Sequence, residues 1–112
     1  DWLRSLDFYK DELKTLKSRL TEVAGKNTGD EASIGAGHFE SQFTIQLVNI
    51  DKLHQDIQRH LAAAAAQSEK TLGHIETSTL TDHDALRERY IAEEKTIHEL
   101  RHEFYRYASK WM

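Results

Sequence analysis

The chain of 112 residues contains no proline and no cysteine. About five prolines would be expected from average usage in a chain of this length. Because proline breaks helix interiors and is frequent in the turns of β-rich folds, its absence favours long uninterrupted helices. The lack of cysteine excludes disulfides, thiolate metal sites and cysteine nucleophiles. It also fits the reducing cytoplasm, which is where we expect this protein to be located.

Other absences exclude several classes of function. No apolar run approaches the roughly 20 residues that a membrane-spanning helix needs. The net charge is −4, and the 15 basic and 19 acidic residues of the chain are interspersed. The sequence therefore predicts no basic face of the kind that binds nucleic acid or an anionic membrane. The glycines lack the Gly-Lys-Ser/Thr ending of a phosphate-binding loop, and no nucleophile stands beside a base. We therefore expect no enzyme, no catalytic residue and no cofactor.

Large apolar residues recur at alternating spacings of four and three in two stretches, about residues 2–24 and 82–110. This heptad pattern is typical of a helix that packs along one narrow seam. The first predicted seam consists of Trp2, Leu6, Tyr9, Leu13, Leu16, Leu20 and Val23. The other consists of Leu86, Tyr90, Glu93, Ile97, Leu100, Phe104, Tyr107 and Trp111.

A longer helix is predicted between them, over about residues 38–76. Its seam begins with Phe39, Phe43, Gln46, Ile50, Leu53 and Ile57. After Ile57 the pattern allows two alternatives. A strict heptad places His60, Gln67 and His74 inward, whereas a shift of one residue selects Leu61, Ala64, Ser68, Leu72 and Ile75. We prefer the shifted alternative because it keeps apolar residues inside.

Two connections separate these helices. Residues 25–37 hold four of the five glycines and are predicted to form a flexible loop, although residues 30–34 could instead form an early turn of the second helix. Residues 77–81 are predicted to be a short polar connection, with Thr81 and Asp84 as a capping box. The predicted fold is all-α: a single domain over residues 1–112, an antiparallel three-helix bundle with coiled-coil-like heptad seams and a long central helix.

Seven histidines raise the possibility of a metal site. His98 and His102 have a spacing that can chelate zinc, copper or nickel. Asp51 with His54, and Glu99 with His102, resemble the Glu-x-x-His pairs of di-iron bundles. The seams, however, place His98, His102 and Glu99 toward solvent and leave His54 beside its seam. The pairs do not converge, so we predict no metal ligand.

Glu93 is the one carboxylate at a predicted seam position. A buried carboxylate is costly unless it is paired or hydrogen-bonded. Candidate partners on the second helix are Gln46, His54 and His60. We interpret Glu93 as a polar contact that fixes the register of the helices. The alternatives are a side chain that extends to solvent and a functional carboxylate.

The two ends of the chain carry a resemblance. Residues 1–23, which begin Asp-Trp-Leu-Arg-Ser-Leu-Asp-Phe-Tyr, and residues 94–112, which end Tyr-Ala-Ser-Lys-Trp-Met, resemble small uncharacterised bacterial helical-bundle proteins. The three-helix length is also similar to a spectrin-type repeat, in architecture alone. These resemblances imply no activity and no site residue. We expect a non-catalytic structural or protein-interaction bundle; the alternative is a metal- or ligand-binding bundle that uses core Glu and His residues.

Helix lengths suggest an oligomer. At 1.5 Å per residue the three predicted helices measure about 35, 58 and 45 Å. On these lengths the outer helices overlap fully only near residues 50–61, so seam residues toward both ends would stay exposed. A second copy packed antiparallel would cover them, and the alanines at 62–66 would permit close approach. We therefore expect a homodimer through the second helix. The alternative is a compact monomeric bundle, with a break near Gly73 or a longer first loop.

Overall fold

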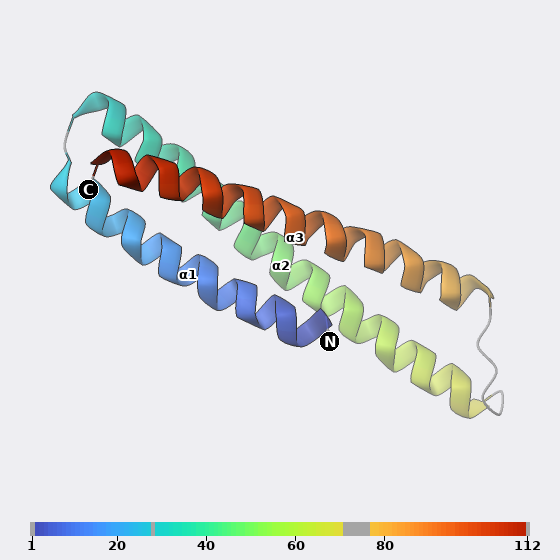
Figure 1. Cartoon of the computed structure of the whole chain (residues 1–112). Coiled ribbons are helices and arrows are strands. Elements are labelled where there is room, and N and C mark those ends of the chain that lie inside the picture. Colours follow the sequence, from blue (N-terminus) through green and yellow to red (C-terminus); the bar gives the residue numbers. More distant parts are fainter. Residues whose placement is uncertain (1, 28, 71–76, 112) are drawn as a thin grey trace.

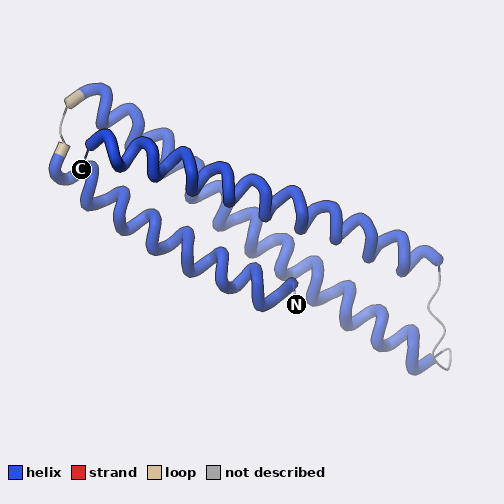
Figure 2. Tube along the Cα trace, in the orientation of Figure 1, coloured by secondary structure: helices blue, strands red, loops and turns tan. Residues whose placement is uncertain are grey.

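A computed structural model describes residues 2–27, 29–70 and 77–111. It contains α1 (Trp2–Lys26), α2 (Asp30–Lys70) and α3 (Thr77–Trp111), of 25, 41 and 35 residues. They form a rod with extents of 63 × 17 × 17 Å. α1 and α3 run in the same direction and α2 runs antiparallel to both (Figures 1 and 2). The predicted fold class, an all-α three-helix bundle with a long central helix, is confirmed.

The three predicted seams meet along the axis of the rod and form one core. The side chains of α1 that are buried are those predicted, apart from the partly buried Trp2. The core also contains Phe39, Phe43, Ile50, Leu53, Ile57, Leu86, Ile97, Leu100 and Phe104. Aromatic rings fill one end, where Phe104 meets Phe39 and Phe43 edge to face, with centroids 5.5 and 5.3 Å away. Heptad spacing therefore identified the buried faces of α1 and α3, and that of α2 as far as Ile57.

The predicted flexible loop at 25–37 is wrong over most of its length, because α2 begins at Asp30. Gly35 lies against the ring of Tyr107, where an added Cβ would stand 2.3 Å from Cε1. The Tyr107 hydroxyl donates a hydrogen bond to the carbonyl of Ala32 at 2.6 Å. This glycine therefore serves close helix packing rather than a turn, and tertiary contact overrides its low helix propensity.

The predicted polar connection at 77–81 is also wrong, because α3 already begins at Thr77. Thr81 and Asp84 lie inside the helix and form no cap. The Thr79 hydroxyl donates to Oε1 of Gln67 at 2.8 Å, so α2 gives this first part of α3 a polar partner. The predicted course of the second helix through residues 71–76, including Gly73, lies outside the described residues.

The phase shift preferred after Ile57 is contradicted at Leu61, which is 48% exposed. His60 and Gln67, the positions of the strict heptad, are partly buried instead. Each finds a polar partner on α3, so the inward position is tolerated without an apolar side chain. Ala64, which the shifted alternative placed inward, is partly buried, and the side chains at 68, 72 and 75 lie outside the described part of the structure.

The outer helices overlap over a longer stretch than predicted. Trp2, at the start of α1, stacks on His83, while Asn27, just after its end, donates to the carbonyl of Trp111. α3 also reaches the start of α2, since Lys110 pairs with Glu31. Three helices therefore pack together along most of the rod, and at one end, past the start of α1, the described residues belong to α2 and α3 alone (Figure 1). No described helix is long and apolar enough to cross a membrane.

Candidate functional site

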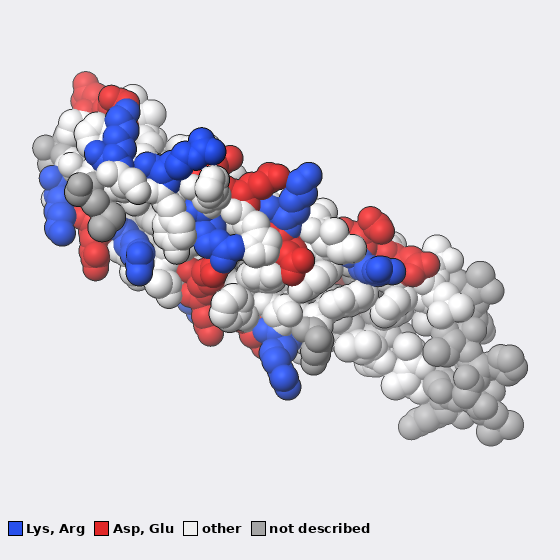
Figure 3. All heavy atoms as spheres, viewed as in Figure 1, with Lys and Arg blue, Asp and Glu red and all other residues white. Residues whose placement is uncertain are grey.

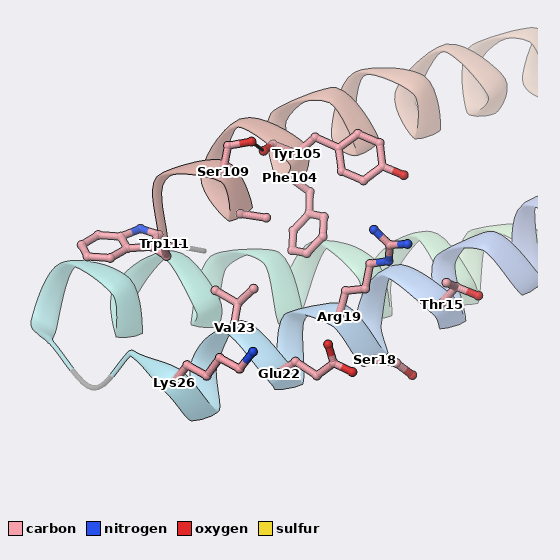
Figure 4. A pocket seen from close by; sticks show the side chains of 11 residues that line it. Thr15, Ser18, Arg19, Glu22, Val23, Lys26, Phe104, Tyr105, Ser109 and Trp111 are labelled. Carbon is pink, nitrogen blue, oxygen red and sulfur yellow. Dashed lines mark hydrogen bonds between the residues drawn. The ribbon is translucent and has the colours of Figure 1, made fainter.

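A hollow of about 690 Å³ lies between α1 and α3, near the C-terminal ends of both helices. We call it the α1–α3 groove. Val23 of α1 and Phe104 of α3 point into the space between the helices, and Arg19 reaches from α1 toward α3 (Figure 4). The lining residues are Thr15, Ser18, Arg19, Glu22, Val23, Lys26, Phe104, Tyr105, Ala108, Ser109 and Trp111.

The groove arises from a short side chain at a repeating position. Glu94, Arg101 and Ala108 are seven residues apart on α3 and face α1 in turn. Glu94 and Arg101 are long enough to reach α1, where they bind Tyr9 and Glu12. Ala108 ends at its Cβ and stays buried at 5% exposure, so the space beyond it is left open. The groove is therefore apolar at its floor and polar along its rim.

A second hollow of about 340 Å³ continues this face toward the start of α1, with Thr15, Arg19 and Tyr105 lining both. It adds Phe8, which is 61% exposed, and Tyr105 is 45% exposed. From Phe8 to Lys26 the face is about 27 Å long, at 1.5 Å per residue. Viewed from this side, both signs of charge are scattered over α1 and α3, with uncharged atoms between them (Figure 3).

Polar links join α1 to α3 beside the core. The hydroxyls of Tyr9 and Tyr90 both donate to Oε2 of Glu94, at 2.6 and 3.1 Å. Burial raises the pKa of both tyrosines, and the negative charge of Glu94 adds to the increase. One nitrogen of Arg101 contacts both carboxylate oxygens of Glu12, at 3.0 and 2.8 Å. The sequence analysis did not find these links. The signal that could have found them is a tyrosine at a seam position of each helix, because a buried hydroxyl needs a polar partner.

Glu93 occupies its predicted seam position and is partly buried. Its partner is Gln46 of α2, whose side chain is buried. With its amide nitrogen turned toward α3, Gln46 donates to both carboxylate oxygens, at 2.6 and 3.1 Å. Desolvation raises the pKa of Glu93 from 4.5 to about 7, and the two hydrogen bonds from Gln46 act against this increase because they favour the charged carboxylate. The amide also satisfies the protonated acid, because its carbonyl can accept the carboxyl proton when the amide is reversed.

The other candidate partners of Glu93 bind elsewhere. His54 Nε2 lies 3.3 Å from a carboxylate oxygen of Asp7, and His60 contacts His83 of α3. The predicted polar contact between Glu93 and the second helix is therefore made by Gln46. Neither catalytic chemistry nor ligand binding is needed to explain the carboxylate, since its hydrogen bonds serve the packing of α2 against α3.

The remaining histidine and acidic candidates do not form one site. His98 and His102 are exposed on α3, with His98 against Arg101 and Tyr9. Glu99 is exposed and lies 4.0 Å from Lys95. Asp51 pairs instead with Lys10 of α1 at 3.0 Å. Across residues 2–27, 29–70 and 77–111, no group of three or more His, Asp or Glu could hold a metal ion.

Known proteins offer no guide to this site. No family model, no curated protein and no solved structure matches the chain. Function is therefore argued from the groove and the side chains themselves.

Proposed function

We propose that this chain is a non-catalytic protein-interaction bundle, and that its α1–α3 groove binds one amphipathic helix of a partner protein. A single observation supports this: from Thr15 to Lys26, a length of about 17 Å, the groove leaves an apolar floor open between two parallel helices. That length matches about three turns of helix. A helix laid in such a groove buries its apolar face as bundle helices do.

Charge and polarity favour one orientation of the partner. Neighbouring helices in this bundle are antiparallel wherever they are joined, so a fourth helix antiparallel to α1 and α3 would complete an up-down-up-down arrangement. Its N-terminus would then lie at the end of the groove lined by Arg19, Glu22 and Lys26, where the two cations outnumber the one carboxylate. Acidic residues are favoured in the first turn of a helix, and these two cations complement them. The partner is thus an amphipathic helix with an acidic first turn.

The expected homodimer through the second helix remains a prediction. Its support is the outer face of α2, where Ile34, Ile45 and Val48 are 74%, 47% and 62% exposed. The groove and this outer face lie on different sides of the bundle, so the two forms of association can be separated by mutation. A cytoplasmic location and the absence of enzymatic activity likewise remain predictions.

The test uses the whole chain and a displayed library of amphipathic 18-residue helices. The residues of the first turn are randomised in this library. Selected peptides should be rich in Asp and Glu in the first turn. They should bind wild type and the control Val48→Glu equally, and Tyr105→Glu about tenfold more weakly, because the new charge lies at the groove. Equal binding to all three proteins, or no acidic enrichment, would contradict the groove.

Light scattering of the same three proteins separates the dimer from the groove. A homodimer through α2 predicts twice the chain mass for wild type and Tyr105→Glu, and a single-chain mass for Val48→Glu. A single-chain mass for wild type at all concentrations would exclude the dimer and leave the groove proposal intact.

A further inference from the structure

His60 and His83 face each other across the start of the two-helix end of the rod. His60 is partly buried and His83 is exposed, and His60 Nε2 lies 3.3 Å from His83 Nδ1. The ring centroids are 5.3 Å apart, with 40° between the ring planes. Two ring nitrogens, one from each helix, are therefore held close together although 23 residues separate them in sequence.

This separation equals the spacing of two ligands on a tetrahedral metal ion. Zinc binds histidine nitrogen at about 2.0–2.1 Å, which places two nitrogens of a tetrahedral site about 3.3–3.4 Å apart. Without a metal, one nitrogen carries a proton and donates to the other. With both nitrogens deprotonated, a small rotation of each ring would aim the two lone pairs at one point. The two imidazoles thus need little rearrangement to become ligands.

The surroundings hold the histidines and leave them accessible. The ring of His83 stacks on Trp2 of α1, with centroids 4.8 Å apart and 22° between the planes. His60 also lines an open hollow of about 410 Å³, together with Asp56 and Asp82. Asp56 is paired with Arg89 at 2.9 Å, so it is not free to ligate. A metal can therefore approach from solvent and meet a ring that is already oriented.

We propose that His60 and His83 bind one divalent transition metal ion, of the class Cu²⁺, Ni²⁺ or Zn²⁺, and that this ion clips α2 to α3 at the two-helix end. Imidazole suits these metals, and Cu²⁺ binds most tightly of the three. The residues that the structure describes supply two nitrogens, which leaves coordination positions for water. The site is independent of the α1–α3 groove, which lies at the opposite end of α1.

Quenching of Trp2 fluorescence by Cu²⁺ reports on this site directly. The protein carries no histidine tag, and Trp111→Phe in every variant leaves Trp2 as the only indole. Because Trp2 stacks on His83, Cu²⁺ bound there should quench its emission, with one equivalent per chain. His60→Ala leaves the Trp2–His83 stack in place, so it removes a ligand without altering the reporter.

The matched control is the double variant His98→Ala/His102→Ala, which removes the other histidine pair on α3. We expect its Cu²⁺ affinity to equal that of the parent, and that of His60→Ala to fall at least about tenfold. Calorimetry with Zn²⁺ should show the same order, and Zn²⁺ should raise the melting temperature of the parent but not of His60→Ala. Unchanged affinity in His60→Ala, or its loss in the His98/His102 control, would overturn the proposal.

Discussion

The ring of Tyr107 lies against the backbone of Gly35 so closely that an added Cβ would stand 2.3 Å from Cε1. Gly37, two residues later in the same helix, meets no atom of the described residues within 4 Å of an added Cβ. The two glycines therefore make a matched pair. We expect Gly35→Ala to destabilise the protein because the ring must move and its hydrogen bond to Ala32 is disturbed.

Gly37→Ala should have the opposite effect and stabilise the protein by up to about 1 kcal/mol, since alanine is the better helix former at an open position. Urea melts of the two variants provide the measurement. Two changes of the same sign would contradict the packing of Tyr107 on Gly35.

Glu93→Gln should stabilise the folded protein above pH 7 and change it little below pH 4.5. The folded-state pKa of about 7 exceeds the ordinary value of 4.5, so the favourable contribution of the protonated acid is complete below 4.5 and is lost as pH rises to 7. A shift of this size on a half-buried group corresponds to about 1–2 kcal/mol after allowing for solvent screening.

The measurement is the difference in unfolding free energy between Glu93→Gln and wild type across this pH range. Groups that titrate equally in both proteins cancel in that difference. Glu99→Gln, the same change at an exposed position on the same helix, is the control. A flat profile for Glu93→Gln would show that burial does not perturb this carboxyl group.

Leu16→Ala, Leu53→Ala and Leu100→Ala should each lower the free energy of unfolding by about 2–5 kcal/mol. The three leucines are 1%, 2% and 5% exposed, and one comes from each helix. Lys14→Ala and Glu99→Ala, at exposed positions, should stay within about 0.5 kcal/mol of wild type. Equal effects in the two sets, measured by chemical denaturation, would place the core on another face.

Tyr9→Phe should destabilise the protein by about 1–2 kcal/mol, because it removes the 2.6 Å hydrogen bond to the carboxylate of Glu94. Tyr90 still donates to that oxygen, so the carboxylate keeps one partner. Tyr105→Phe, at an exposed position, should change stability by less than about 0.5 kcal/mol. Thermal melts compare the two, and a larger effect at Tyr105 would refute the role given to Glu94.

The heptad spacing was sufficient to predict most of the core. It marks the face that each helix buries, and this face can be identified without knowing which helices pack against it. Glycine content was a poorer guide to the helix boundaries. Gly35 lies in a glycine-rich segment typical of a turn, but in the structure it packs against the ring of Tyr107. Only the fold reveals that contact. Hydrophobicity likewise gave the wrong position at Leu61, because the choice between Leu61 and His60 depended on where α1 begins and on a histidine 23 residues away.

The polar contact of Glu93 could be predicted from its seam position, and Gln46 was among the named partners. The groove could not be predicted from the seams alone, since its lining mixes seam residues with others from α1 and α3. A weaker pattern did exist: Glu94 and Arg101 are followed, after one more heptad, by Ala108. A change from long to short side chains at one heptad position predicts an open space between two helices. The prediction requires knowing that this position faces the other helix.

The start of α1 beside His83 divides the rod into parts of unequal cooperativity. Near Leu53 each backbone amide is shielded by a core shared among three helices, and its exchange with solvent should require global unfolding. Beyond His60 the two remaining helices shield each other on one side only, and Ala62, Ala63, Ala65 and Ala66 are exposed. Amide hydrogens there should exchange through fraying of the helix pair, at a lower free energy than global opening. The molecule thus has a rigid body at one end and a pair of helices at the other that can separate without unfolding the rest.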